Sequence, residues 1–300
     1  MSDLLLDPPK ETILWIGGTS SLARTFFANY GDVVHVVERH NETTRFQERK
    51  WILTGLETEA PWWIQHAAHI NDISIDYMSL DLTNLTVKSA QRFLLKDTTS
   101  RYPVTNMIIG VRPLLFDKYI FTDQTDYMLK GLKIFLEQAV VQLSSLDYIL
   151  HISSVAAADH LREQCNAEEQ DPLPPLSEYH APYDRFKRGS EDVITKICQG
   201  DGDENTKQIS CCHLRLSAIF SDDRSCIQCS ALDLQARVGC YLPLAIDCNS
   251  SLNVAKAINL LLNEAAIGRG SPDHALQRPL SQVFYYTRPL DLKEPSLQNS

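Results

Sequence analysis

The feature that most constrains the fold is an apolar run that ends in glycine and is followed at once by a helix. Residues 13–17 read ILWIG, a Ser- and Thr-rich turn comes next, and SLARTFFANY has helical character. A second β-rich run, DVVHVVE at 32–38, predicts a strand that ends at Glu38. A strand, turn, helix and strand of this combined length predict a βαβ unit, in which the two strands are parallel.

The same alternation continues along the chain. Further strands are expected at 73–82, 104–111, 146–154 and 208–220. Helices with apolar residues at helical spacing are expected at 126–143 and 183–199, and the segment 39–72 is expected to add a helix and an irregular excursion. Strands that alternate with helices predict an α/β fold, namely a Rossmann-type, doubly wound and mainly parallel sheet with a small C-terminal substrate lobe.

Charge and composition argue against several classes of partner. The formal net charge of −10 and the pI near 5.4 disfavour nucleic acid and anionic membranes, which are bound through basic patches. We expect no signal peptide and no membrane span, and therefore a cytoplasmic protein. The eight cysteines are expected to be reduced, and no metal site is predicted because the CxxC of Cys226 and Cys229 has no second pair of ligands.

Ligands of doubly wound sheets bind at the carboxyl ends of the strands, so the residues after each strand are candidate site residues. Gly17 occupies the tight-turn position of a GxxGxxG phosphate loop, whereas Ser20 and Ala23 replace the later glycines. A ligand-free strand-to-helix turn would have a similar sequence. The residues predicted to hold a pyrophosphate are Gly17, Thr19, Ser20, Ser21 and Leu22.

The residues after the second and third predicted strands bear on the nucleotide. Glu38 can accept hydrogen bonds from both hydroxyls of an adenosine ribose and would repel a 2′-phosphate, which favours NAD. Arg39 or Arg24 could instead bind that phosphate, so the predicted cofactor is NAD or NADP, with NAD favoured. Asp81 and Leu82 are predicted to lie beside the adenine, although Asp81 is equally suited to capping the next helix.

A serine and a Tyr-Lys pair follow the fifth predicted strand. Ser154 ends the segment HISS, and Tyr183 and Lys187 are spaced i, i+4 at the start of the next helix, on one face. A lysine ammonium beside a phenol lowers the phenol's pKa, which makes tyrosine an acid and base at cell pH, while a serine hydroxyl can hold a substrate oxygen. One YxxxK by chance would be no surprise among eleven tyrosines, so the pair alone proves nothing. A site is indicated by candidate residues that follow successive predicted strands in a consistent order.

In this order the sequence resembles the extended short-chain dehydrogenase/reductase family, in its 3β-hydroxysteroid dehydrogenase/isomerase-like and NAD-dependent epimerase/dehydratase-like branches. The resemblance implies that Ser154, Tyr183 and Lys187 are catalytic and that Lys187 also binds the nicotinamide ribose. Met128 stands where the family often has Asn, and IGVRP replaces its small residues after the fourth strand. The segments that carry the resemblance are GGTSSLA, YILHISSVA, YDRFK, HLRLSAIF and DCNSSLNVAKAINLLL.

The resemblance also implies a domain plan. The chain is expected to be a single α/β unit over 1–300, in which 11–220 form the NAD(P)-binding core and 244–267 pack back on it. The segments 221–243 and 268–300 are expected to form the small substrate-binding lobe.

The predicted function is that of an NAD(P)-dependent dehydrogenase or reductase, which transfers hydride between nicotinamide and an alcohol or ketone. Loops at 155–180, 221–245 and 270–290 suit a small apolar, sterol-like or aromatic substrate. Two alternatives stay open, namely a nucleotide-sugar epimerase or dehydratase, and a cofactor-binding regulatory or scaffold protein without activity. The helices at 126–143 and 184–198 resemble the pair through which the family dimerises, which makes a homodimer a further expectation.

Overall fold

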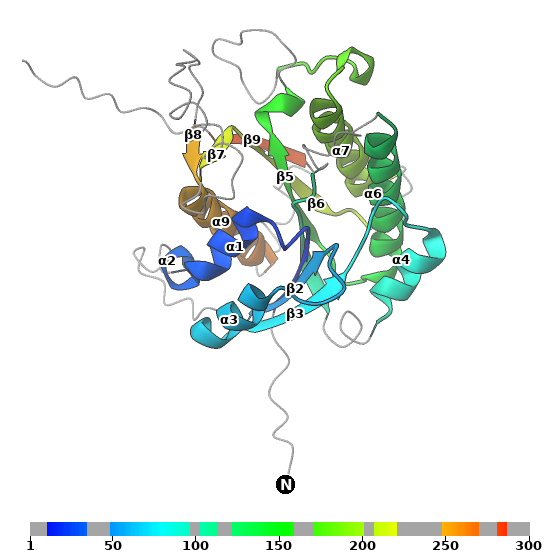
Figure 1. Ribbon diagram of the computed structural model, residues 1–300. Coiled ribbons are helices and arrows are strands. Elements are labelled where there is room, and N and C mark those ends of the chain that lie inside the picture. The colour runs from blue at the N-terminus through cyan, green and yellow to red at the C-terminus, as the bar shows by residue number, and fades with distance from the viewer. Residues whose placement is uncertain are drawn as a thin grey trace, which may run out of the picture.

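The computed structural model describes residues 11–34, 49–96, 103–112, 122–158, 171–200, 207–220, 248–269 and 281–286. These residues form a seven-stranded parallel sheet with the order β3-β2-β1-β4-β5-β6-β9 (Figure 1). This order confirms the predicted Rossmann-type, doubly wound fold. The strands are β1 (Glu11–Ile16), β2 (Arg49–Gly55), β3 (Ser74–Ser79), β4 (Val104–Ile109), β5 (Tyr148–Ser154), β6 (Ser210–Leu216) and β9 (Ser281–Tyr286).

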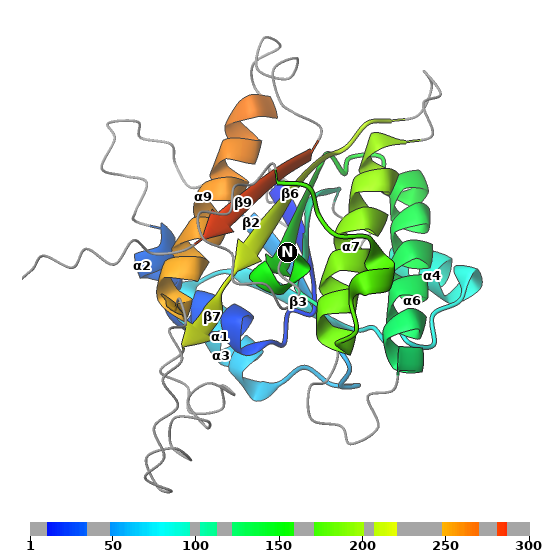
Figure 2. The same cartoon turned by 90° about the horizontal axis from the view of Figure 1, so that it is seen from above.

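Helices cover both faces of the sheet, as the view from above shows (Figure 2). One face carries α1 (Ser21–Ala28), α2 (Tyr30–Val34), α3 (Trp62–Asn71) and α9 (Ser251–Arg269). The other carries α4 (Val87–Leu94), α6 (Thr122–Gln142) and α7 (Pro182–Gln199). Shorter elements are the 3₁₀ turns η2 (Val155–Ala157) and η3 (Leu176–Glu178) and a two-stranded sheet of β7 (Ala218–Phe220) and β8 (Cys248–Ser250).

The alternation of side chains along β1 creates a separate core on each face. Ile13 and Trp15 belong to the core beneath α1 and α9, whereas Leu14 and Ile16 belong to the core beneath α4 and α6. All four side chains are buried, as expected of a central parallel strand that is covered on both faces. Among the described residues, no helix combines the length and the hydropathy that a bilayer crossing requires.

Aromatic side chains fill the core beneath α1. Trp15 of β1 and Trp51 of β2 contact Phe26 and Phe27 of α1. The ring centroids of Phe26 and Phe27 lie 5.2 and 5.1 Å from that of Trp51, both in edge-to-face geometry. Each such pair contributes about 0.5–1.5 kcal/mol beyond the area that it buries, so Trp51 anchors β2 to the centre of the fold.

The second strand is not where the sequence analysis predicted it. Residues 32–34 belong to α2, where Val33 is buried and its carbonyl accepts a hydrogen bond from Asn259 of α9, and residues 35–38 lie outside the described residues. β2 is RKWILTG, which the sequence analysis assigned to an irregular excursion. Residues 50–55 of this strand are buried, and β2 pairs in parallel with β1 and β3. The prediction failed because β2 is stabilised by burial between two other strands. That burial is a tertiary effect, and the local composition of the sequence does not reveal it.

The predicted C-terminal lobe also needs a correction. Residues 281–286, which the sequence analysis assigned to the lobe, form β9 and pair in parallel with β6 from Cys211 opposite Ser281 to Leu216 opposite Tyr286. They join the main sheet because pairing with β6 satisfies main-chain groups of both strands. Helix α9 packs against α1. The segments 221–247, 270–280 and 287–300 lie outside the described residues, so the lobe itself stays a prediction.

A buried polar network ties the amino ends of the strands together. Glu11 of β1 accepts hydrogen bonds from Arg49 of β2 and from Asn106 of β4. Arg49 donates two further bonds, to Asn259 and Asn263 of α9. The guanidinium and the carboxylate are therefore paired directly, and their network joins three strands to a helix.

Candidate active site

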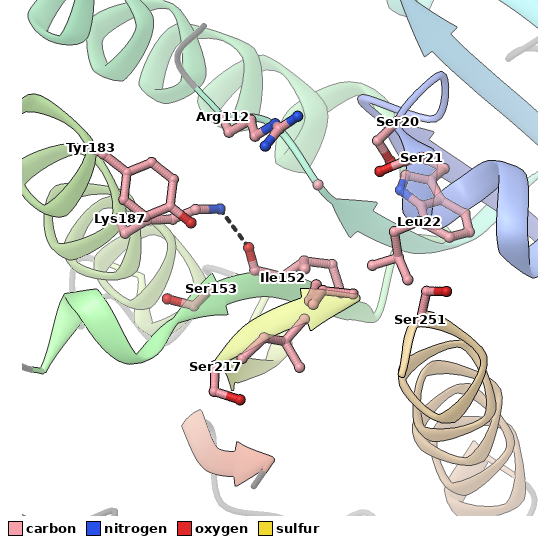
Figure 3. A pocket seen from close by; sticks show the side chains of 14 residues that line it. Ser20, Ser21, Leu22, Arg112, Ile152, Ser153, Tyr183, Lys187, Ser217 and Ser251 are labelled. Atoms are coloured by element: carbon pink, nitrogen blue, oxygen red, sulfur yellow. Dashed lines mark hydrogen bonds between the residues drawn. The ribbon is translucent and has the colours of Figure 1, made fainter. Parts of the chain in front are cut away.

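A cavity lies at the carboxyl ends of the central strands (Figure 3). It opens where β1 leads to a helix on one face of the sheet and β4 leads towards the other face, which is the switch point where doubly wound folds bind ligands. Its lining residues are Trp15, Ser20, Ser21, Leu22, Gly110, Arg112, Ile152, Ser153, Tyr183, Lys187, Leu216, Ser217, Ile219 and Ser251.

The turn after β1 brings the start of α1 to this cavity. Gly17 has φ +78°, and a Cβ there would lie 3.1 Å from main-chain atoms of Gly110 and Val111, so glycine is needed for both conformation and space. Ser20 caps α1, because its Oγ accepts a hydrogen bond from the Ala23 amide at 3.3 Å. The helix amino terminus thus faces the cavity, which suits an anion such as a pyrophosphate.

The indole of Trp15 adds a hydrogen-bond donor that sequence reasoning missed. Trp15 is fully buried and lines the cavity, and within the described part of the chain its Nε1 has no hydrogen-bond partner. A buried donor without a partner costs about 1–3 kcal/mol, so a ligand that brings an acceptor to this position would recover stability. In the sequence, this tryptophan stands two residues before the first motif glycine. A tryptophan in that place indicates only a core residue.

The acid that follows β2 is Glu57, and not Glu38. β2 ends at Gly55, where a Cβ would lie 2.5 Å from the side chain of Thr19 and 2.7 Å from a carboxylate oxygen of Glu57. Tyr77 donates a hydrogen bond to the Glu57 carbonyl at 2.7 Å. Glu57 therefore lies beside the turn after β1 and is a further candidate for the ribose. Glu38 lies outside the described residues, so its predicted role stays a prediction.

The carboxylate of Asp81 is hydrogen-bonded within the turn that follows it. It accepts bonds from the amide and hydroxyl of Thr83 and from the side chain of Asn84. Partial burial acts to raise the pKa of Asp81, but these hydrogen bonds hold the pKa below its ordinary value. Thr86, rather than Asp81, caps α4. Neither Asp81 nor the buried Leu82 is among the cavity-lining residues, so their predicted place beside the adenine stays a prediction.

The structure brings Ser154 and Tyr183 together. Ser154 is the last residue of β5, and its Oγ accepts a hydrogen bond from the Ala156 amide at 3.2 Å. Pro182 opens α7, so Tyr183 lies in the first turn of that helix, with the Ser154 side chain near enough to its hydroxyl to affect its pKa. Tyr183 lines the cavity, whereas the neighbouring Ser153, and not Ser154, is the lining serine at the end of β5.

Lys187 is buried beneath this pair. Its amine donates to the main-chain carbonyls of Ile152 at 2.7 Å and Val111 at 3.2 Å, and lies 5.9 Å from the ring centroid of Tyr183. Burial lowers the pKa of Lys187 to about 7, with the nearby charge of Arg112 acting in the same direction. At neutral pH the amine is therefore only partly protonated.

The predicted lowering of the Tyr183 pKa by Lys187 is therefore wrong for the protein without a bound cofactor. Burial raises the pKa of Tyr183, while the nearby Ser154 side chain and the charge of Arg112 act to lower it. Lys187 does not provide the lowering because burial removes part of its own charge. Arg112 is the cation that the sequence analysis missed, since IGVRP registered there only as a departure from the family pattern.

A buried network behind Ser154 holds α7 against the sheet. Arg215 of β6 makes two hydrogen bonds to Glu191 of α7, at 3.0 and 2.8 Å, and Ser153 donates a third. Burial acts to raise the pKa of Glu191, but Arg215 holds the pKa below its usual range. His151 and His213 face each other with their Nδ1 atoms 3.1 Å apart, and burial keeps the pKa of His151 well below its ordinary value. These contacts fix the helix that carries Tyr183.

Part of the predicted site lies outside the described residues. This applies to Glu38 and Arg39, to the CxxC of Cys226 and Cys229, and to most of the predicted substrate loops. Within the part of the chain that the structure describes, no three His, Cys, Asp or Glu side chains gather in a way that could hold a metal ion.

Comparisons with known proteins were made on both sequence and structure. No protein-family model matches the sequence, and no curated protein matches it. A solved UDP-glucose 4-epimerase from Stenotrophomonas maltophila, with bound NAD and formylated UDP-arabinopyranose, has a TM-score of 0.63 at 11% identity, covering 92% of this chain and 78% of that one. A dTDP-glucose 4,6-dehydratase from Streptomyces venezuelae, with NAD and TYD bound, has a TM-score of 0.61 at 15% identity, covering 92% and 76%.

A third similar structure is the terminal R domain of the myxalamid PKS-NRPS biosynthetic pathway. Its TM-score is 0.61 at 14% identity, and the match covers 95% of this chain and 68% of that one. At such identities the likeness shows the fold alone. This chain shares its Rossmann-type fold with these three proteins.

Proposed function

We propose that this protein binds a nicotinamide dinucleotide and transfers hydride between the nicotinamide and the carbonyl or alcohol carbon of a small substrate. The observation that carries the proposal is that Tyr183, with the Ser154 side chain near its hydroxyl, lines the same cavity that the start of α1 faces. A proton donor for a substrate oxygen and a site for a pyrophosphate thus occur at one switch point.

The residues around the cavity fit a dinucleotide. The amino terminus of α1 suits the pyrophosphate, and the buried N–H of Trp15 can donate to an acceptor on the ligand. Glu57 beside the turn suits a ribose with free hydroxyls, which favours NAD. Arg24, whose guanidinium carbon lies 5.8 Å from the ring centroid of Trp62, is the cation that competes for NADP.

The proposed chemistry divides between three side chains. The bound nicotinamide would supply or accept the hydride. Ser154 holds the substrate oxygen, and Tyr183 donates its hydroxyl proton to that oxygen when a carbonyl is reduced and recovers the proton when an alcohol is oxidised. Because burial raises the pKa of Tyr183, the phenol is protonated at neutral pH, and the side chains by themselves favour carbonyl reduction. Lys187 is proposed to contact the nicotinamide ribose.

A second candidate is a nucleotide-sugar epimerase or dehydratase. It is favoured by two of the similar structures, an epimerase and a dehydratase that hold NAD together with nucleotide ligands. Such an enzyme would use the same Tyr183 and Ser154, but the hydride would return to the substrate and the cofactor would show no net change. A third candidate, a cofactor-binding regulatory or scaffold protein, would bind the dinucleotide without turnover.

The test has two stages. Isothermal titration with NAD, NADH, NADP and NADPH should show micromolar binding of one pair, with NAD(H) preferred. The absorbance of NAD(P)H is then followed with a panel of sterols, aromatic ketones and nucleotide sugars, and nucleotide-sugar products are analysed by chromatography to detect the second candidate.

Variants assign the chemistry to Tyr183. The variants Tyr183→Phe and Ser154→Ala should each lower turnover by at least about 10²-fold while the cofactor Kd changes little, because general acid catalysis contributes on that scale. The matched control is Tyr179→Phe, a buried tyrosine whose hydroxyl donates to the Ala157 carbonyl instead and whose loss should leave turnover intact. Unchanged turnover in Tyr183→Phe, or no binding of any dinucleotide, overturns the proposal.

A further inference from the structure

We propose that Arg112 and Lys187 form a coupled pair of cationic groups, so that the dinucleotide binds together with a proton, which Lys187 takes up from solvent. This inference rests on the proposed function, because the pair responds to a cofactor phosphate only if a dinucleotide occupies the cavity. In this inference, Arg112 binds a cofactor phosphate, and Lys187 changes from a neutral amine to an ammonium when the dinucleotide binds.

The first support is the position of Arg112. It is an exposed residue that follows β4 and lines the same cavity as Lys187, Ser20 and Ser21. In Figure 3 its guanidinium lies between Lys187 and Tyr183 on one side and the two serines at the start of α1 on the other. A pyrophosphate at the amino terminus of α1 would therefore lie beside Arg112, where a guanidinium can bind phosphate oxygens.

The second support is the surroundings of Lys187. Its amine is held by two main-chain carbonyls, which accept hydrogen bonds whether or not the amine carries an extra proton. The titratable and charged groups that face it are Arg112 after β4, His151 on β5, and Tyr183 and Glu191 on α7. The carboxylate of Glu191 is already paired with an arginine of β6, so its attraction for the amine is shared. Lys187 is thus a buried base with a pKa of about 7.

The coupling follows from Coulomb's law. The guanidinium of Arg112 disfavours a proton on the buried Lys187 amine, in addition to the larger effect of burial itself. A pyrophosphate carries two negative charges, so its arrival beside Arg112 balances the guanidinium and removes that repulsion. One proton then leaves a buffer molecule and forms an N–H bond on the lysine amine. No other bond forms or breaks.

The uptake has a definite pH dependence. At pH 6 Lys187 already holds its proton before binding, so uptake is close to zero. At pH 8 the free protein has lost most of that proton, and we expect the complex to regain more than about half of one proton per dinucleotide. Affinity should therefore fall as the pH rises above 7, by up to about tenfold per pH unit.

The proton uptake also gives Tyr183 its second role. The Lys187 amine lies 5.9 Å from the ring centroid of Tyr183, so a full ammonium there lowers the pKa of the phenol. Tyr183 thus becomes a competent base only in the presence of bound cofactor.

The experiment is a titration of the full chain with the dinucleotide that binds more tightly, at pH 6 and pH 8. At each pH, two non-phosphate buffers with different ionisation enthalpies are used, and the difference in binding enthalpy gives the number of protons taken up. Uptake above about half a proton at pH 8 and below about 0.2 at pH 6 is the expected result.

Variants assign the proton to its site. Lys187→Met should abolish the uptake at pH 8. Arg112→Gln should reduce the uptake at pH 8 and weaken binding about threefold to tenfold, because the repulsion that the dinucleotide relieves is then absent and one phosphate contact is lost. Arg112→Gln changes an exposed side chain, so the test remains valid if Lys187→Met folds poorly. Arg185→Gln, on the same helix but paired with Asp126, should leave uptake unchanged.

The outcomes separate the two proposals. Binding without proton uptake at pH 8, or uptake that persists in Lys187→Met and Arg112→Gln, overturns this inference and leaves the proposed function intact. If none of the four dinucleotides binds, the proposed function is overturned, and this inference with it.

Discussion

Two buried cations at opposite ends of the parallel sheet, Arg49 and Lys187, are held in different ways. At the amino ends of the strands, Arg49 is paired directly with the carboxylate of Glu11. At the carboxyl ends, the amine of Lys187 is also buried but is held by two main-chain carbonyls, and the indole N–H of Trp15 has no partner within the described residues. Paired buried charges keep their charge, whereas a buried base without a dedicated counter-ion shifts its pKa.

This difference separates the structural end of the sheet from the end that a ligand would complete. At the amino end the carboxylate of Glu11 and the guanidinium of Arg49 bond to each other and to three asparagines, which links three strands to α9. The carboxyl end keeps hydrogen-bonding capacity and a titratable amine near neutral pH, which are features of sites that bind ligands and move protons. The following predictions test this contrast.

The largest effect is expected from breaking the pair at the amino end. Arg49→Leu should lower the free energy of unfolding by about 3–5 kcal/mol, because it leaves the Glu11 carboxylate buried without its cation. Urea denaturation at pH 7 measures the change. Adding Glu11→Leu to the same chain should recover part of the loss, since the unpaired charge is then removed as well. A loss below about 1 kcal/mol for Arg49→Leu would show that this network is not structural.

The next effect is a pH dependence of the free energy of unfolding, which originates from Lys187 at the carboxyl end. The pKa of Lys187 is about 7 in the folded chain and that of an unfolded lysine is about 10.4, so the unfolded state binds more protons between these values. The contribution of Lys187 to stability therefore rises with pH across this window, by up to about 1.4 kcal/mol per unit. Lys187→Met should lose this slope, which urea denaturation between pH 7 and 10 measures as the difference from the natural chain.

The matched control for Lys187 is the buried lysine at the amino end. Lys50 is paired with Asp76 at 2.8 Å, so Lys50→Met should lower stability rather than relieve a cost. Equal effects of the two Lys→Met variants on the pH slope would remove the contrast between the two ends.

The smallest effect is expected at the unpartnered indole. Trp15→Phe keeps most of the aromatic packing and should change the free energy of unfolding by less than about 1 kcal/mol. It should nevertheless weaken dinucleotide binding about threefold to tenfold, because one donor to the ligand is lost. Trp51→Phe, in the same aromatic cluster but not among the cavity-lining residues, should leave affinity within about twofold. If both variants bind alike, Trp15 has only a core role.

Local sequence signals predicted much of the frame. The glycine turn at Gly17 and the alternation of strands and helices predicted the Rossmann-type fold, and the structure confirms it. Pro182 followed by Tyr183 and Lys187 predicted a helix start with both side chains on one face, and α7 begins there. These signals work because turn conformation and helix periodicity depend on neighbours in the sequence.

The sequence failed where the outcome depends on distant residues. RKWILTG and DVVHVVE are both β-rich, but it is RKWILTG that pairs with β1 and β3 and packs its Trp51 against Phe26 of α1. The structure adds Glu57, which follows β2, as an acid beside the turn after β1. No local pattern distinguishes the two strand candidates, because burial on both faces of a strand is decided by the elements that cover it.

By itself, the sequence determined the class of fold, the turn at the first strand and the placement of a tyrosine, a lysine and a serine at strand and helix ends. Only the tertiary structure decided which segment is the second strand, that the lysine amine is buried with a pKa near 7, and that Arg112 faces it across the cavity. The physical reason is that conformation is set largely within a few residues, whereas burial and electrostatic environment arise from segments that are far apart in the chain.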